Sequence, residues 1–220
     1  MLIERAGERL GQIRLSFDID NTCIGTYART VHLYNWVHGT NHRFEDVKTN
    51  WELARWFEKD TTLEDGRAAA TNFYNSRQVM VEADPTAGAM VVLSWLKRLQ
   101  IKPLFISARP ATATGFTYEW YGYWTPWIDR NSFLLQTDGV DINPEHKVQK
   151  INSKGIEWHF EDVAEDALDI LNRTKAGVVM VNQPWNLDFS YAGSRLIRSQ
   201  DPRSMSNLAY AFLELTRRLV

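Results

Sequence analysis

From residue 88 onward, the apolar and polar positions switch between the two periods that are typical of helices and strands. Apolar residues recur three and four positions apart from Ala89 to Leu99, which predicts an amphipathic helix. Short apolar runs predict strands at 102–108, 133–136, 156–160 and 177–181. A further helix is predicted over 110–123, and others are predicted to begin at Asn143-Pro144-Glu145 and at Asp201-Pro202. Another is predicted to begin at Asp162, which would be its N-cap, with Glu165 completing a capping box. This alternation predicts a mostly parallel sheet with helices on both faces.

A fifth strand is predicted near the N-terminus, where Leu-Ser-Phe leads directly into two carboxylates. These are Asp18 and Asp20, and the hydroxyl of Thr22 follows them. If the strand ends after Phe17, both carboxylates can converge at its carboxyl end and suit a hard cation such as Mg²⁺. One could then be a nucleophile and the other a proton donor. The alternative is an ordinary turn, because Asp and Asn start turns readily.

Residues 24–87 break the pattern, because they carry many aromatic and charged residues and no convincing apolar strand. We interpret them as a helical cap inserted after strand one, with a helix starting near Asp60-Thr61-Thr62. Residues 1–23 and 88–220 would then form a three-layer, Rossmann-like α/β core around a mostly parallel five-stranded sheet. The cap tryptophans Trp36, Trp51 and Trp56 could stack on a nucleobase, but for any single one a place in the cap's own core is favoured.

Other polar residues stand where the remaining strands are predicted to end. Ligands bind at the carboxyl ends of strands in open α/β sheets, so these positions are candidate site residues. They are Ser107 and Arg109 after strand two, Glu161 and Asp162 after strand four, Asp166 one helical turn later, and Lys147 in the preceding helix. Each has an ordinary structural alternative: a strand end, a helix cap, a surface lysine or an ion pair. Two choices stay open, Lys150 in place of Lys147 as the cation and Glu161 in place of Asp162 as the acid that faces the metal.

Composition narrows the class of protein. The chain has 220 residues, a net charge of −2 and 24% charged residues, which argues against a nucleic-acid polymer as partner. Its single cysteine, Cys23, permits no intramolecular disulfide, and a packed thiol is favoured over a nucleophile. Because no signal-peptide-like or membrane-spanning apolar run is present, we expect a cytoplasmic protein without a membrane partner. The nine tryptophans would fit a homodimer surface as well as a dense core.

The ordered segments FDIDNT, FISAR, Lys147 and FEDVAED resemble the four motifs of the haloacid dehalogenase-like (HAD) phosphohydrolase superfamily. Within it, the short helical cap and MVNQPWN at 180–186 make the chain most similar to the 5′(3′)-deoxyribonucleotidase family. This resemblance covers about residues 12–190. One departure is Asn21, where the commonest pattern has Gly, but Asn tolerates unusual backbone angles.

The resemblance implies a role for each matching residue. Asp18 matches the nucleophile and Asp20 the acid/base. Thr22, Ser107, Ala108, Arg109 and Lys147 match the phosphate-binding positions; Asp18, Asp20 and Asp162 match the metal site, which Asp166 supports. The implied activity is Mg²⁺-dependent hydrolysis of a small-molecule phosphomonoester through an aspartyl-phosphate, with a nucleoside monophosphate favoured. The alternatives are a phosphatase for another small metabolite or sugar phosphate, and a non-catalytic binding protein with the same fold.

Overall fold

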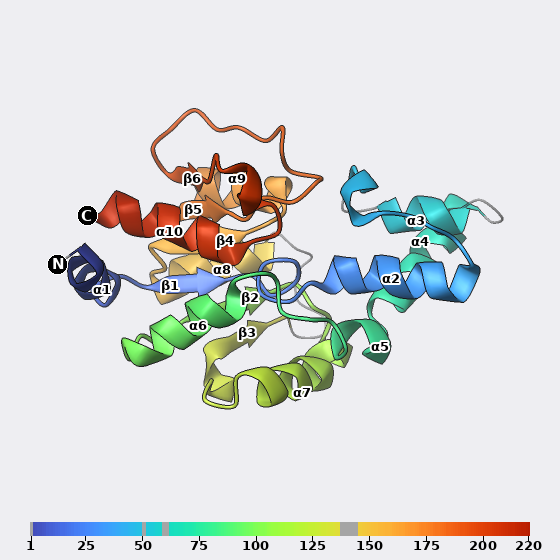
Figure 1. Ribbon diagram of the computed structural model, residues 1–220, viewed down its shortest axis with the longest axis horizontal. Coiled ribbons are helices and arrows are strands. Elements are labelled where there is room, and N and C mark those ends of the chain that lie inside the picture. The colour runs from blue at the N-terminus through green and yellow to red at the C-terminus, as the bar shows by residue number, and fades with distance from the viewer. Residues whose placement is uncertain (1, 50–51, 59–61, 137–144) are drawn as a thin grey trace.

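The computed structural model contains a parallel sheet of six strands rather than the predicted five (Figure 1). It describes all residues except 1, 50–51, 59–61 and 137–144, so the predicted helix start at Asn143-Pro144 lies outside the described residues. The strands are β1 (Leu15–Phe17), β2 (Leu104–Ser107), β3 (Phe133–Leu135), β4 (Trp158–Glu161), β5 (Gly177–Met180) and β6 (Leu196–Arg198). The sixth strand was missed because Leu-Ile-Arg is too short a run to show an apolar period.

Strand β1 lies in the middle of the sheet, whose order is β3-β2-β1-β4-β5-β6. The chain therefore builds outward from β1 on one side through β2 and β3, and on the other side through β4 to β6. Phe17 is in register with Phe105 of β2 and Phe160 of β4, so the residues that follow these strands meet at one sheet edge. This edge, where the strand order reverses, is the position at which open α/β sheets bind ligands.

Two hydrophobic clusters fill the space between the sheet and the helices on its faces. One face is covered by α1 (Leu2–Leu10), α6 (Ala89–Arg98), α7 (Thr114–Trp124) and α10 (Leu208–Leu219). The other face is covered by α8 (Glu145–Lys154) and α9 (Ala164–Arg173). Apolar strands such as Gly-Val-Val-Met of β5 are fully buried because both of their faces are covered in this way.

Residues 24–87 form a group of helices beyond the carboxyl end of β1, beside the sheet rather than on its faces (Figure 1). They are α2 (Thr26–His38), the short 3₁₀ turn η1 (Phe44–Asp46), α3 (Glu52–Phe57), α4 (Leu63–Tyr74) and α5 (Arg77–Met80). Helices α2, α3 and α4 share a hydrophobic cluster that contains Trp56, whereas Trp36 is 78% exposed and Trp51 lies outside the described residues. The start of α4 is capped by Thr62, whose hydroxyl accepts a hydrogen bond from the Asp65 amide; Asp60 and Thr61 are not described.

Several local predictions were wrong in detail. Helix α9 has Val163 as its N-cap without a side-chain bond, so Asp162 and Glu165 form no capping box and the Asp162 carboxylate stays free for the sheet edge. Asp201 caps the 3₁₀ turn η5 (Pro202–Ser204), and α10 begins only at Leu208 with Asn207 as its cap. The N-terminal helix α1 was not predicted.

A close approach between α6 and α10 fixes the way the chain returns from the helical group to the sheet. Gly88 has φ +76°, and a Cβ atom there would lie 2.5 Å from the Ala209 Cβ. Any other residue would therefore force the two helices apart. No helix in the described part of the chain is both long enough and apolar enough to cross a lipid bilayer.

Candidate active site

Four elements bring carboxylates and one ammonium group together at the carboxyl edge of the sheet. Asp18 follows β1 and its amide donates to the Phe160 carbonyl at 2.8 Å, which continues the pairing with β4. Lys147 projects from α8, and its Nζ lies 2.9 Å from Asp18 Oδ1, 2.6 Å from Glu161 Oε2 and 2.8 Å from Asp166 Oδ2. Lys147, not Lys150, is therefore the cation among the acids. Its pKa is raised well above its usual range, because the three carboxylates outweigh the effect of burial.

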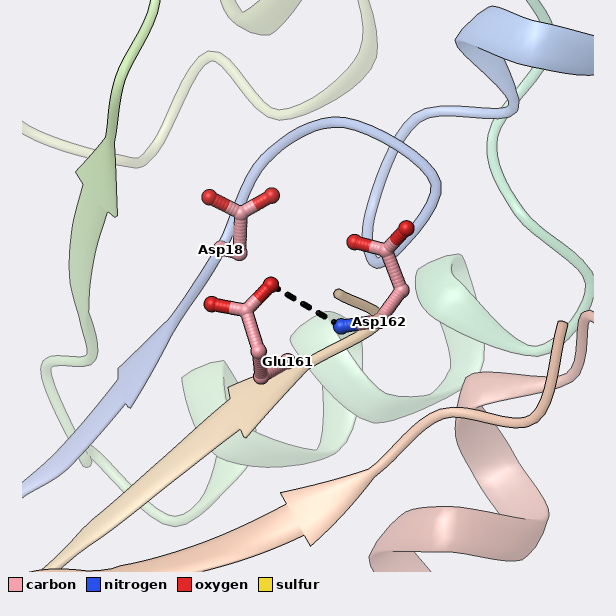
Figure 2. A group of neighbouring side chains, drawn as sticks. All are labelled: Asp18, Glu161 and Asp162. Atoms are coloured by element: carbon pink, nitrogen blue, oxygen red, sulfur yellow. Dashed lines mark hydrogen bonds between the residues drawn. The ribbon is translucent and has the colours of Figure 1, made fainter. Parts of the chain in front are cut away.

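Three carboxylates face one another across the ends of β1 and β4 (Figure 2). Asp18, Glu161 and Asp162 each offer an oxygen, and these oxygens all lie within 4.8 Å of one another. All three side chains are buried. Close carboxylates repel when ionised, so the arrangement is stable only with protons or a cation between them.

The three carboxyl groups of the cluster differ in the direction of their pKa shifts. The pKa of Asp18 is raised to about 8, mainly by burial, although Lys147 opposes the shift. Burial and the neighbouring Glu161 and Asp18 likewise raise the pKa of Asp162 well above its usual range. Burial also opposes ionisation of Glu161, but Lys147 and His159 outweigh it and lower its pKa to about 2. The site therefore favours the ionised form of Glu161 and the protonated forms of Asp18 and Asp162.

The hydrogen bonds indicate which of these acids could bind a metal ion. Glu161 Oε1 accepts from the amides of Asp162 and Val163 at 3.0 and 3.1 Å, and its Oε2 contacts Lys147 and His159. Asp162 Oδ2 is buried with no donor, and Asp18 Oδ1 has the Lys147 ammonium nearby but no directed hydrogen bond. A buried oxygen without a donor, such as Asp162 Oδ2, is costly. Together with an oxygen of Asp18 within 4.8 Å, it forms a hard-oxygen donor set that fits Mg²⁺.

Asp20 lies apart from this cluster. Its two oxygens accept from Arg109 Nη2 and Nε at 2.7 and 2.9 Å, and the Thr26 hydroxyl adds a third, short hydrogen bond. Burial opposes ionisation of Asp20, but Arg109 and Thr26 outweigh it and lower the pKa of this carboxyl. The Arg109 side chain is 1% exposed and also donates to Thr117 at 2.9 Å, so most of its donors are engaged within the protein. Arg109 and Asp20, which are predicted to bind the phosphate and to serve the metal site and proton transfer, therefore contact each other directly.

The remaining predicted residues border the same place. Thr22 Oγ1 lies 3.5 Å from Asp162 Oδ1, and Ser107, at the end of β2, accepts from the Arg109 amide at 3.3 Å. Asn21 has φ 55°, and its side chain accepts from the Tyr27 amide at 2.8 Å, so this Asn adopts the left-handed backbone that Gly would otherwise supply. Ala108 lines the cavity between Ser107 and Arg109.

A cavity of about 420 Å³ opens directly in front of the acids. Its far wall comes from the helical group, with the side chains of Tyr27, Leu53, Tyr74 and Met80 among others. The volume and the mixture of an apolar wall with convergent polar groups are typical of small-molecule sites. Sequence reasoning missed these wall residues, along with His159 and Thr26, because none of them belongs to a strand-end motif.

Comparison with known proteins agrees with this geometry at the level of the fold. No family model matches the chain. A stretch of 86 residues, 39% of the chain, is 29% identical to the "Putative nucleotidase YqfW" of Bacillus subtilis strain 168, of whose length it spans only 40%.

Solved structures resemble the chain over most of its length at low identity. A hydrolase from Pseudomonas syringae has a TM-score of 0.54 at 13% identity, covering 94% of this chain and 99% of that one. The magnesium-bound HAD-hydrolase YfnB of B. subtilis, described as putative, has a TM-score of 0.54 at 12% identity, covering 87% and 95%. A HAD family hydrolase from Deinococcus radiodurans with bound phosphate and sodium has a TM-score of 0.51 at 14% identity, covering 84% and 90%. The chain therefore has the Rossmann-like α/β fold of HAD-superfamily hydrolases, with an acidic cluster at its strand ends.

Proposed function

We propose that the protein is a Mg²⁺-dependent phosphatase that forms a phosphoryl intermediate on Asp18, and that its substrate is a nucleoside monophosphate. The observation that carries the proposal is the convergence of Asp18, Asp162 and Lys147 on the floor of one cavity. Asp162 has a buried oxygen without a hydrogen-bond donor, Asp18 is ion-paired with Lys147, and the Lys147 ammonium group can meet a phosphate. Mg²⁺ would be held by Asp18 and Asp162, with Asp166 supporting through Lys147, and would supply charge neutralisation at the phosphoryl oxygens.

The reaction would proceed in two displacements at phosphorus. In the first, an Asp18 carboxylate oxygen forms a bond to phosphorus while the bond to the leaving oxygen breaks, and Asp20 donates a proton to that oxygen. In the second, a water oxygen bonds to phosphorus and passes a proton to Asp20. The bond between phosphorus and Asp18 breaks, so that inorganic phosphate is released and the Asp18 carboxylate is restored. Lys147 and the hydroxyl of Ser107, which line the cavity, would contact the phosphoryl oxygens, and the buried Thr22 hydroxyl would support Asp162.

The geometry favours Asp20 as the base of the second step. As an ionised carboxylate paired with Arg109, it is ready to accept a proton from water. Donating a proton in the first step requires the protonated form, which a shift of Asp20 away from Arg109 toward the leaving group would favour. Arg109 would then act on the reaction through Asp20, as a positioning residue.

We further propose that residues 24–87 act as a cap that selects the substrate, while 1–23 and 88–220 form the core. The cavity wall supplied by the cap carries two tyrosines, Tyr27 and Tyr74, and aromatic rings of this kind stack readily on bases. The resemblance to deoxyribonucleotidases and the partial match to a nucleotidase support a nucleotide as the leaving group.

One assay tests both parts of the proposal. Phosphate release would be measured with Mg²⁺ and with EDTA for 5′- and 3′-nucleoside monophosphates, common sugar phosphates and p-nitrophenyl phosphate. We expect Mg²⁺-dependent turnover, preference for nucleotides, and no turnover by Asp18→Asn. A clear preference for sugar phosphates would refute the nucleotide part. Wild-type-like turnover by Asp18→Asn would refute the phosphatase mechanism itself.

A further inference from the structure

The loop after β5, residues Gln183 to Asn186, connects the two segments that carry Asp18 and Asp162. Its sequence, Gln-Pro-Trp-Asn, lies on no predicted helix or strand and none of its side chains lines the cavity. Yet Gln183 and Asn186 are each only 1% exposed. Buried amide side chains away from a binding surface require a structural or positioning explanation.

Asn186 contacts the segment that carries Asp162. Its Nδ2 donates to the Asp162 carbonyl oxygen at 2.7 Å and to the Val181 carbonyl oxygen at 2.9 Å. The indole Nε1 of Trp185 donates to the same Asp162 carbonyl at 3.2 Å. Both lone pairs of this carbonyl are therefore met by the loop, which fixes the backbone from which the Asp162 carboxylate projects.

Gln183 contacts the segment that carries Asp18. Its Nε2 donates to the Asn21 carbonyl oxygen at 2.6 Å, three residues after Asp18, and its Oε1 accepts from the Ser206 hydroxyl at 2.6 Å. The backbone N–H of Gln183 also donates to Asn186 Oδ1 at 3.1 Å. Gln183 and Asn186 therefore belong to one hydrogen-bonded unit. Pro184 between them restricts the backbone of that unit further.

We propose that Gln183 and Asn186 are positioning residues that set the separation between Asp18 and Asp162 and thereby the affinity for the metal ion. We call the pair the carbonyl clamp. The inference rests on the proposed function, because it concerns the same metal site. Its physical basis is that two close carboxylates push their segments apart when both are ionised, and the clamp connects those segments through neutral donors. Neutral amides can resist this repulsion without adding a further charge to the cluster.

Neutral substitutions test the clamp without changing the charge near the cation. Asn186→Ala removes the donors to Asp162 and Val181, and Gln183→Met removes the donor to Asn21 at similar side-chain volume. Asn152→Ala is the matched control, because Asn152 Nδ2 also donates to a backbone carbonyl, that of Arg173, but at an exposed position on α8. The Kd for Mg²⁺ and for Mn²⁺ would be measured by titration calorimetry at a temperature where circular dichroism shows each variant fully folded.

We expect both clamp variants to bind the cations about 10–100-fold more weakly, which is the usual effect of removing a group that orients a metal ligand. Asn152→Ala should stay within about twofold of wild type. With saturating Mg²⁺, the clamp variants should lose kcat more than they raise KM. If Asn186→Ala fails to fold, Gln183→Met decides alone. Folded clamp variants with wild-type Kd values would overturn the clamp and leave the phosphatase proposal intact, whereas a wild-type protein that binds neither cation would overturn both.

Discussion

The buried carboxyl groups make the stability of the metal-free protein fall as the pH rises toward neutrality and above. The pKa of Asp18 is raised from 3.8 to about 8, chiefly by burial. Within that interval the folded protein keeps a proton that the unfolded chain has released, so the folded state is favoured at the acid end. Each pH unit in the interval lowers the free energy of unfolding by about 1.4 kcal/mol for this one group.

Other groups of the site act over lower pH ranges. Glu161, with a pKa of about 2, and Asp20, whose pKa is also lowered, stabilise the fold above their ordinary values and lose that contribution as the pH falls through their folded values. Burial lowers the pKa of His159 from 6.5, so His159 favours unfolding only below that value. The interval from 6.5 to about 8 therefore isolates Asp18 and Asp162, whose pKa values are raised.

Urea unfolding in EDTA across this interval measures the effect directly. Wild type should lose about 1–2 kcal/mol of unfolding free energy between the two ends, since over most of this interval folded Asp18 holds a proton that the unfolded chain has already lost. Asp18→Asn, an uncharged isostere, should show a distinctly shallower loss, while the exposed control Asp188→Asn should keep the wild-type slope. Mg²⁺ should restore stability most at the alkaline end, because its ligands must be deprotonated. Equal slopes for wild type and Asp18→Asn would refute the assignment of the buried proton to Asp18.

Three further outcomes follow from the contacts of the site. Lys147→Met should lower the free energy of unfolding by about 3–5 kcal/mol in urea titrations, because it leaves buried carboxylates without their cation, whereas Lys150→Met should change it by less than about 0.5 kcal/mol. Arg109→Lys should reduce kcat by about 10–100-fold with little change in KM, since it disturbs the two-point contact with Asp20; a rise in KM alone would place Arg109 on the substrate phosphate instead. Tyr74→Ala should raise KM for nucleotides more than for p-nitrophenyl phosphate, while Tyr123→Ala, at a 77% exposed position, should change neither; equal effects of Tyr74→Ala on both substrates would contradict a contact with the base.

The strand ends could be read from the sequence because apolar runs and the polar residues that follow them are local signals. Parallel topology then brings those ends together without any knowledge of the contacts, which is why Asp18 and Asp162 were predicted to meet. Lys147 lies on a helix, and the choice between it and Lys150 needed the contacts. The three residues of β6 carry no such signal, and β6 is specified by pairing with β5 rather than by its own pattern. The Gln183 bond to the Asn21 carbonyl has no signature either, since a side chain that donates to a distant backbone group leaves no period in the sequence.

The sequence could not show whether Glu161 or Asp162 faces the metal, because the two acids differ in their hydrogen bonds and not in their type or position. Both are acids at one strand end, and both lie within reach of Asp18, so residue type and position alone do not separate them. Hydrogen bonding separates them. Glu161 accepts from two backbone amides and contacts Lys147 and His159, while Asp162 Oδ2 accepts no hydrogen bond from the described part of the chain. An acid whose acceptors are already filled would have to give up several hydrogen bonds to bind a cation, whereas Asp162 can offer Oδ2 without giving up any. Glu161 is therefore better placed to fix Lys147 and the Asp162 backbone. This distinction depends on donors from α8, from His159 of β4 and from the two backbone amides that follow β4.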